Sequence, residues 1–224
     1  MQQPAYSEAQ MADRFLRLLR SRKGIPGLGR FTSVFREVDC IRGRADFLAV
    51  ATPFSGASDK IELPFGLTDS AVLAQLNPRS PRTADYLVGS TGFSSRSIRG
   101  AVEKLRSLNM IRRVGTDSYV LGNLNPMFKA QLWAFELKIA NMRRAIFQAQ
   151  QYRALASRVM IVVPPEKSRI VIRFSAALRT WGLGVATFDY FSREIGVIRH
   201  PASGRPASRQ HHMYAVAQML RRAS

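Results

Sequence analysis

The sequence predicts an α/β protein whose mixed sheet, flanked by helices, is interrupted by a separate helical module. Strand-like apolar runs occur near both ends of the chain, whereas the middle of the chain has short helical periodicities. After residue 128, a strand-like run, a helix and a second buried strand follow in the order of a βαβ crossover. The 224 residues, of which 46% are hydrophobic, suffice for one large or two smaller domains with a real core.

The first predicted part of the sheet domain covers residues 1–64. It begins with an amphipathic helix over residues 7–20 and continues with strands over residues 33–40 and 44–51. A polar connector rich in proline and glycine follows over residues 51–66. This connector predicts a domain boundary.

Residues 65–127 have the pattern of an inserted winged-helix module. Helices are predicted over residues 69–76, 81–91 and 94–111, and a short hairpin over residues 112–121. Three compact helices followed by a hairpin are the elements of a winged helix, which predicts a DNA-binding role for this part.

The second part of the sheet domain is predicted over residues 128–224. A strand over residues 131–140, a helix over residues 141–157 and a buried strand over residues 159–164 form the predicted crossover. Further elements follow, and the chain ends in a short basic helix over residues 211–222.

The charge of the chain predicts a polyanionic partner. Lys and Arg total 34 and Asp and Glu total 15, a formal net charge of +19, so nucleic acid is the first candidate and an anionic membrane surface the second. No apolar stretch approaches the ~18 residues that span a bilayer, so we expect no membrane-spanning segment. With nucleic acid as the first candidate, we expect double-stranded DNA as the partner and no membrane. The start of the sequence lacks a signal-peptide layout, which predicts a cytoplasmic protein. Cys40 is the only cysteine, which excludes disulfides within one chain and cysteine-based zinc sites.

The segment "WAFELK" places two charges in an otherwise apolar strand. Side chains of a strand alternate between faces, so Glu136 and Lys138 point to one side, while Trp133, Phe135 and Leu137 point to the other. This acid-x-Lys spacing occurs once in the chain. Charges in a buried strand are costly, which favours a functional role for them.

Asp46, in the second predicted strand, completes a candidate catalytic set with Glu136 and Lys138. Two carboxylates can hold Mg²⁺ against a phosphate, with Mn²⁺ as a substitute, while a nearby ammonium orients or activates the attacking water. The set therefore predicts metal-dependent hydrolysis of phosphodiester bonds, with Asp46 and Glu136 as the metal ligands.

These residues resemble the PD-(D/E)xK, or restriction endonuclease-like, nuclease superfamily. "GRADFLAV" supplies Asp46 and "FELK" supplies Glu136 and Lys138, with Ala45 where the named motif has proline. The resemblance implies a core made of a helix, a three-strand meander, a crossover helix and a further strand. Asp46 and Glu136 are 90 positions apart, and an insertion of the 63 residues 65–127 leaves 27, which fits the family.

The resemblance extends to residues near the catalytic set. "QAQQY" places Gln148 and Tyr152 four apart, on one helical face. This spacing is similar to an element of the branch related to the bacterial recombination exonuclease, where the pair lies beside the active site. Some relatives also use a further acid, for which Glu37 is a candidate metal ligand and Glu8 a weaker one.

The third helix of the inserted module predicts the DNA contacts. One stripe of this helix is apolar, and its other face carries Ser95, Arg96, Arg99, Glu103 and Arg106. Arginine can contact guanine bidentately, and we expect Arg96 and Arg99 to read bases. The residues predicted to bind DNA are Ser95, Arg96, Arg99, Arg106, Arg112 and Arg113.

Together these features predict a metal-dependent DNA endonuclease whose winged helix binds or selects duplex DNA, with restriction or defence as the expected setting. Two cuts across a duplex usually need two active sites, so a homodimer is expected. The alternative is a non-enzymatic DNA-binding transcriptional regulator with a nuclease-like scaffold. A third reading is an RNA-processing or RNA-binding protein, because the same metal chemistry cuts RNA.

The same residues also allow structural interpretations. Glu136 and Lys138 could form a solvated charge pair on an edge strand. Asp46 could pair with Arg42 or Arg44 near a turn. The glutamine and tyrosine could belong to an ordinary half-buried helix face, and the arginines of the third helix to a solvated one.

Overall fold

The computed structural model describes residues 6–21, 24–41, 43–51, 65–124 and 126–222. The chain divides into two compact units: the first unit is Met1–Ser55 with Ala130–Ala207, and the second unit is Gly56–Lys129 with Ser208–Ser224. Most of the expected connector, residues 52–64, lies outside the described residues.

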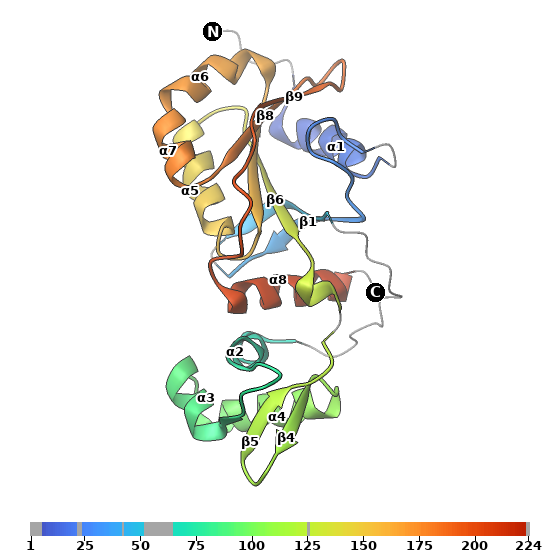
Figure 1. The fold of residues 1–224 in the computed structure, drawn as a ribbon. Coiled ribbons are helices and arrows are strands. Elements are labelled where there is room, and N and C mark those ends of the chain that lie inside the picture. The colour runs from blue at the N-terminus through green and yellow to red at the C-terminus, as the bar shows by residue number, and fades with distance from the viewer. Residues whose placement is uncertain (1–5, 22–23, 42, 52–64, 125, 223–224) are drawn as a thin grey trace. The chain divides into compact units, whose positions relative to one another are not determined.

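The first unit contains a mixed six-stranded sheet (Figure 1). Its strands are β1 (Ser33–Asp39), β2 (Arg44–Val50), β6 (Leu132–Leu137), β7 (Arg158–Val163), β8 (Gly184–Phe188) and β9 (Ile195–Arg199), in the order β1-β2-β6-β7-β8-β9. The β6–β7 and β7–β8 pairs are parallel, and the other pairs are antiparallel. The prediction of an α/β protein with a mixed sheet is confirmed, and β6 is an interior strand. The edge-strand interpretation of Glu136 and Lys138 is therefore wrong.

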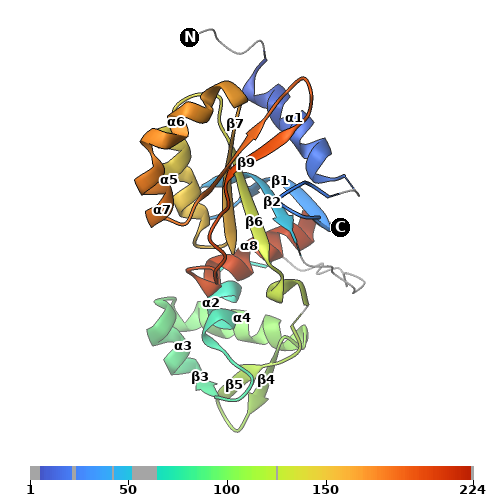
Figure 2. The same cartoon turned by 45° about the horizontal axis from the view of Figure 1, so that its top comes forward.

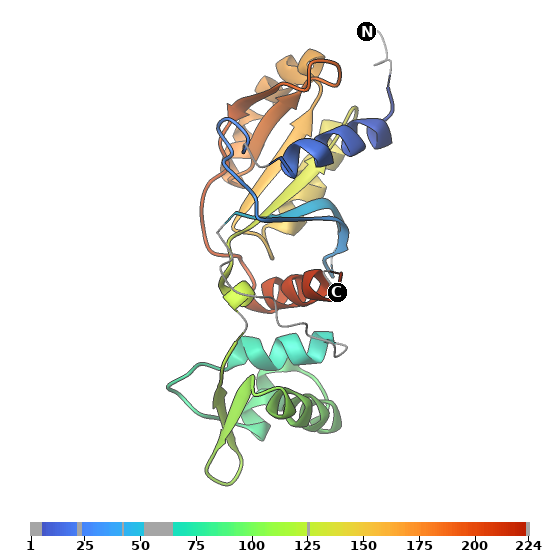
Figure 3. The ribbon, with the colours of Figure 1, turned by 90° about the vertical axis from the view of Figure 1, so that its right-hand side faces the viewer.

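Helices cover both faces of this sheet. The helix α1 (Glu8–Leu19) lies on one face, and α5 (Met142–Tyr152), α6 (Ser168–Arg173) and α7 (Ser175–Thr180) lie on the other (Figures 1 and 3). The short 3-10 helix η2 (Pro165–Lys167) precedes α6. Among the helices of the described ranges, none combines the length and the apolar character needed to cross a membrane.

The core beneath α1 is built around Phe15. Its ring centroid lies 5.3 Å from that of Phe188, 5.6 Å from that of Phe135 and 6.0 Å from that of Phe47. These aromatic side chains come from α1 and from three strands, and all are fully buried. Burial of large side chains at this depth is the main source of stability for the unit. Met11 and Leu19, at helical spacing from Phe15, extend the same core.

The predicted βαβ crossover is confirmed. The strand β6 leads into α5, and the chain returns through the parallel neighbour β7. The left-handed Asn141 caps α5, and its side-chain oxygen accepts a hydrogen bond from the backbone of Arg144. The buried positions of α5 recur at helical spacing and end at Tyr152. The buried face of the helix therefore ends at the tyrosine that the sequence resemblance placed beside the candidate catalytic residues.

The second unit combines helices with a small antiparallel sheet (Figure 2). Its elements are α2 (Leu67–Gln75), β3 (Arg82–Thr83), α3 (Ala84–Thr91), α4 (Ser95–Ser107), β4 (Ile111–Val114), β5 (Ser118–Leu121), η1 (Pro126–Lys129) and α8 (Arg209–Arg222). The three helices and the hairpin predicted from the sequence are confirmed. The two-residue strand β3, which pairs with β5, lies within the range 81–91 that was predicted to be helical, so α3 begins later than expected, at Ala84.

The structure assigns the C-terminal helix differently from the sequence-based domain division. Residues 128–224 were expected to form one part of the sheet domain, whereas α8 belongs to the second unit. His212 Nε2 lies 3.1 Å from the carbonyl oxygen of Phe128, and the guanidinium of Arg209 donates to the carbonyl of Leu76 at 2.8 Å. Buried apolar residues of α8 fix it beside α2: these are Met213, Ala215, Val216, Ala217, Met219 and Leu220.

We expect Phe15→Ala to lower the free energy of unfolding of the first unit by about 3–5 kcal/mol, because it empties the centre of the aromatic core. The exposed Phe147 is the control, and Phe147→Ala should change this free energy by less than about 0.5 kcal/mol. Chemical denaturation followed by tryptophan fluorescence measures both, since the two tryptophans, Trp133 and Trp181, lie in the first unit. Equal effects of the two substitutions would contradict the assigned core.

Candidate functional site

Asp46, Glu136 and Lys138 lie together in the first unit. Phe47 of β2 pairs with Phe135 of β6, and this register places Asp46 beside Glu136. The Oδ2 atom of Asp46 accepts a hydrogen bond of 2.7 Å from the backbone of Leu137. Lys138 Nζ lies 3.7 Å from Oε1 of Glu136. Residues separated by 90 positions in the sequence are thus neighbours in space.

Glu8, the weaker of the two further acid candidates, contacts Lys138 directly. Its Oε1 lies 2.9 Å from Lys138 Nζ, and its Oε2 accepts a hydrogen bond of 3.3 Å from the backbone of Ile139. Glu8 is the first residue of α1, where Ser7 and Gln10 form a capping box that fixes the start of the helix. The ammonium of Lys138 is therefore held between a carboxylate on α1 and one on β6.

Tyr152 connects α5 to the same group. Its hydroxyl lies 2.8 Å from Oε2 of Glu136 and 2.8 Å from the carbonyl oxygen of Arg44, and it can donate its one proton to either. Gln148 is one turn earlier, and its Oε1 is buried with no hydrogen-bond partner among the described residues. Of the predicted pair, Tyr152 is thus hydrogen bonded to the site. Among the described residues, no hydrogen bond joins the Oε1 atom of Gln148 to it.

Glu37 lies at the exposed side of the site on β1. Its backbone has a φ of 50°, an uncommon left-handed conformation for this residue type. Its carboxylate pairs with Arg44 at 3.1 Å and with Arg36 at 3.7 Å. Within the described ranges, Arg44 pairs with Glu37 and Asp39 and not with Asp46, so the interpretation of Asp46 as a partner of Arg44 is wrong. The other proposed partner of Asp46, residue 42, lies outside the described residues.

A cleft of about 200 Å³ opens beside Asp46. Its lining includes three carboxylates, from Glu8, Glu37 and Asp46, and the guanidinium of Arg36. Glu136 does not line this cleft, because its side chain is buried with 1% of its surface exposed. The site thus has an open side formed by α1, β1 and β2 and a buried carboxylate behind it.

Burial raises the pKa of both central carboxyl groups. The pKa of Glu136 is raised to about 7, first by burial and then by the charge of Asp46, while Tyr152 and Lys138 act in the opposite direction. Burial also raises the pKa of Asp46, and the backbone of Leu137 and the ammonium of Lys138 partly offset this effect. The hydrogen bonds and the ammonium group around the two acids therefore compensate only in part for the loss of water around their ionised forms.

A hard divalent cation fits this donor set. Mg²⁺ is commonly bound by one or two carboxylates together with water and substrate phosphates. Within the described part of the chain, Oδ1 of Asp46 and Oε1 of Glu136 accept no hydrogen bond, and the nearest recorded charge to Oε1 of Glu136 is the ammonium of Lys138 at 3.7 Å. In that part of the chain, no group of three or more His, Cys, Asp or Glu side chains has an arrangement suited to a metal ion. Asp46 and Glu136 would form the protein side of such a site, and Glu37, which lines the cleft with Asp46, is the further candidate ligand.

The predicted DNA-binding residues lie in the second unit. Four apolar residues of α4 are buried, which confirms the predicted stripe: Ile98, Ala101, Val102 and Leu105. Ser95, Arg96 and Arg99 are exposed on α4, and Arg112 and Arg113 are exposed on β4. Arg106 is half-buried and pairs with Glu103 at 3.2 Å.

Comparisons of the chain with known protein families, with curated proteins and with solved structures found no match. The interpretation of the site therefore depends on its own geometry and on the sequence resemblance.

The raised pKa of Glu136 predicts a pH-dependent stability in metal-free protein. A folded-state pKa of about 7 against an ordinary value of 4.5 means that the folded state binds this proton more tightly. The resulting stabilisation is complete below pH 4.5 and is lost as the pH rises through about 7. In EDTA, we expect the free energy of unfolding of wild type to fall relative to Glu136→Gln by on the order of 1–3 kcal/mol over this range.

Denaturation curves of the first unit, measured by tryptophan fluorescence at a series of pH values, test this expectation. Parallel pH profiles for wild type and Glu136→Gln would show that the carboxyl group of Glu136 titrates normally.

Proposed function

We propose that the protein is a metal-dependent DNA endonuclease whose first unit is a PD-(D/E)xK nuclease core. The observation that carries this proposal is the convergence of Asp46 with the single Glu-x-Lys spacing of the chain. The element order also supports it, since α1, the β1-β2-β6 meander, the crossover helix α5 and the strand β7 follow the order that the resemblance implies. A homodimer with two such sites would cut both strands.

The second unit, in this proposal, is an inserted winged helix that binds duplex DNA. Its order of α2, β3, α3, α4, β4 and β5 supports this assignment. Arg96 and Arg99 of α4 are exposed and available to bases, and Arg112 and Arg113 to phosphates. A net charge of +19 favours a polyanionic substrate.

The residues of the first unit have distinct roles in the proposed hydrolysis. Asp46 and Glu136 would hold Mg²⁺, and the bound ion would supply positive charge to the scissile phosphate and lower the pKa of a coordinated water. Lys138 would orient the attacking water or the phosphate through its ammonium group. Glu8 positions Lys138 by their 2.9 Å ion pair, and Tyr152 positions the carboxylate of Glu136. The raised pKa values of the two acids favour the binding of a cation, since a positive charge would stabilise both ionised forms.

We expect Asp46→Asn, Glu136→Gln and Lys138→Ala each to lower the rate of DNA cleavage by more than about 100-fold, because each removes a metal ligand or the ammonium group. Binding of duplex DNA in EDTA should change by less than a few fold. Conversion of supercoiled plasmid to nicked and linear forms in Mg²⁺, Mn²⁺ or EDTA measures the rate.

Glu194→Gln is the matched control, because Glu194 is an exposed acid of the first unit outside the site. Cleavage by a Glu136 or Lys138 variant at the wild-type rate would refute the site assignment. Binding without metal-dependent cutting of any DNA would favour the transcriptional regulator, and faster cutting of structured RNA would favour RNA processing.

Tyr152→Phe removes the hydroxyl that hydrogen bonds to Glu136 but keeps the ring in its buried position. We expect the Mg²⁺ concentration for half-maximal cleavage to rise about 10- to 100-fold, because the carboxylate loses its orientation and a stabilising donor. Tyr190→Phe is the control within the same unit. An unchanged Mg²⁺ dependence would mean that Tyr152 has a packing role only.

A further inference from the structure

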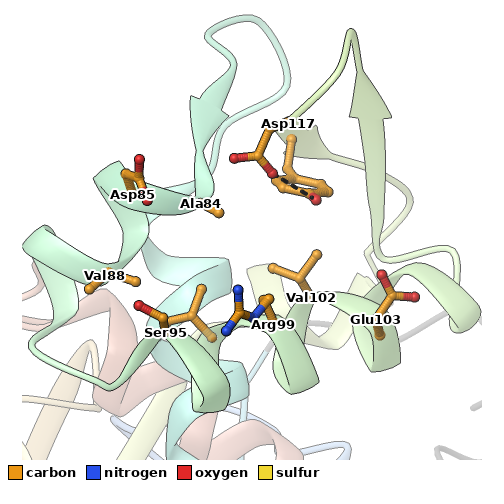
Figure 4. A pocket seen from close by; sticks show the side chains of 10 residues that line it. Ala84, Asp85, Val88, Ser95, Arg99, Val102, Glu103 and Asp117 are labelled. Carbon is orange, nitrogen blue, oxygen red and sulfur yellow. Dashed lines mark hydrogen bonds between the residues drawn. The ribbon is translucent and has the colours of Figure 1, made fainter.

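A cavity of about 290 Å³ lies in the second unit between α3, α4 and the β4–β5 hairpin (Figure 4). Asp85 lines it from α3, Arg99 and Glu103 line it from α4, and Asp117 lines it from the hairpin. Ser95, near the start of α4, adds a hydroxyl to the lining. The apolar floor includes Val88, Ile98 and Val102.

The acidic residues of this region are concentrated in the cavity. Residues 65–125 contain eight Lys and Arg but only four Asp and Glu. Three of these four acids line the cavity, and the fourth, Asp69, is buried in an ion pair with Lys104. Arg99 is the one basic residue of the lining. The cavity therefore has the opposite charge balance from the unit around it.

This lining disfavours a phosphate. Three carboxylates against one guanidinium give the lining a net negative charge, which repels a phosphate group of the DNA backbone. A neutral ligand with hydrogen-bond acceptors and donors side by side can accept from the guanidinium of Arg99 and donate to the carboxylates. The edge of a base pair is such a ligand.

Arg99 and Glu103 are suitably placed for this contact. They are four residues apart on α4, which places their side chains next to each other on one helical face. Among the described residues, Arg99 has no ion-pair partner. Glu103 pairs with Arg106 at 3.2 Å on the exposed surface, an interaction weak enough to be exchanged for a ligand.

Building on the proposed role of the second unit in DNA binding, we propose that this cavity reads the major-groove edge of a G·C pair. Arg99 donates to O6 and N7 of guanine, and the carboxylate of Glu103 accepts from the N4 amino group of cytosine. Asp85 and Asp117 keep phosphates out of the cavity, and Arg112 and Arg113, which do not line it, remain available to the backbone. The second unit thus binds DNA with a preference for particular base pairs and not only through the phosphate backbone.

Selection from a pool of random-sequence duplexes, carried out with the full chain in EDTA, tests this inference without any cutting. Wild type should enrich a motif that contains a G·C pair. On the selected duplex, Arg99→Ala and Glu103→Ala should each weaken binding about 10- to 100-fold. N4-methylation of the cytosine should weaken wild-type binding similarly, because the methyl group replaces the hydrogen that faces the major groove.

A second readout separates base reading from a structural role of Glu103. On an alternating A·T duplex, Glu103→Ala should bind more tightly than wild type, because the variant has lost a charge that repels phosphates. A partly unfolded variant would instead bind both duplexes more weakly. Arg112→Ala is the control, and it should weaken binding to both duplexes by the same factor.

Enrichment of no motif, or a motif whose binding does not depend on Arg99 and Glu103, would overturn the inference. The proposed nuclease stands if metal-dependent cutting persists in that case. Failure of wild type to bind any duplex would overturn the proposed role of the second unit together with this inference.

Discussion

A carboxylate buried in the interior of a sheet is the constraint on which the candidate site depends. Glu136 lies on β6, between β2 and β7, where desolvation opposes its ionised form. Lys138 and Tyr152 compensate for only part of this cost, as the raised pKa of Glu136 shows. Asp46, on the adjacent strand, adds a second negative charge. The protein alone therefore leaves the charge of an ionised Glu136 incompletely compensated, which is the condition under which perturbed carboxyl groups are found at functional sites.

Residues from both faces of the sheet meet at this site. Glu8 comes from α1 on one face and Tyr152 from α5 on the other. Each contacts a residue of the β6 segment, so the positions of the two helices are coupled to the geometry of Glu136 and Lys138. The aromatic core around Phe15 holds α1 against the strands, and this packing places Glu8 at the site.

The sequence predicted the alternating faces of β6, the crossover through α5 and the apolar stripe of α4, because periodicity reports which side chains share a face. It placed Asp46 with Glu136 through the family resemblance. The contact of Glu8 with Lys138 spans 130 positions, and a local pattern contains no information about such a pair. The packing of α8 against α2 was missed for a related reason. The pattern of an amphipathic helix shows that one face is buried, but it does not show which element covers that face. The strand β3 has two residues, too few to show a period.

The assignment of α8 to the second unit has a consequence for folding during synthesis. The ribosome makes α2, α3 and α4 before most of the sheet of the first unit, yet the apolar surface that α8 covers on α2 stays uncovered until α8 follows that sheet. The first unit has all its strands once residue 199 has been made. The first unit can therefore complete its sheet while the second unit still lacks α8, so a nascent chain that has reached this length would have a formed first unit beside an incomplete second one.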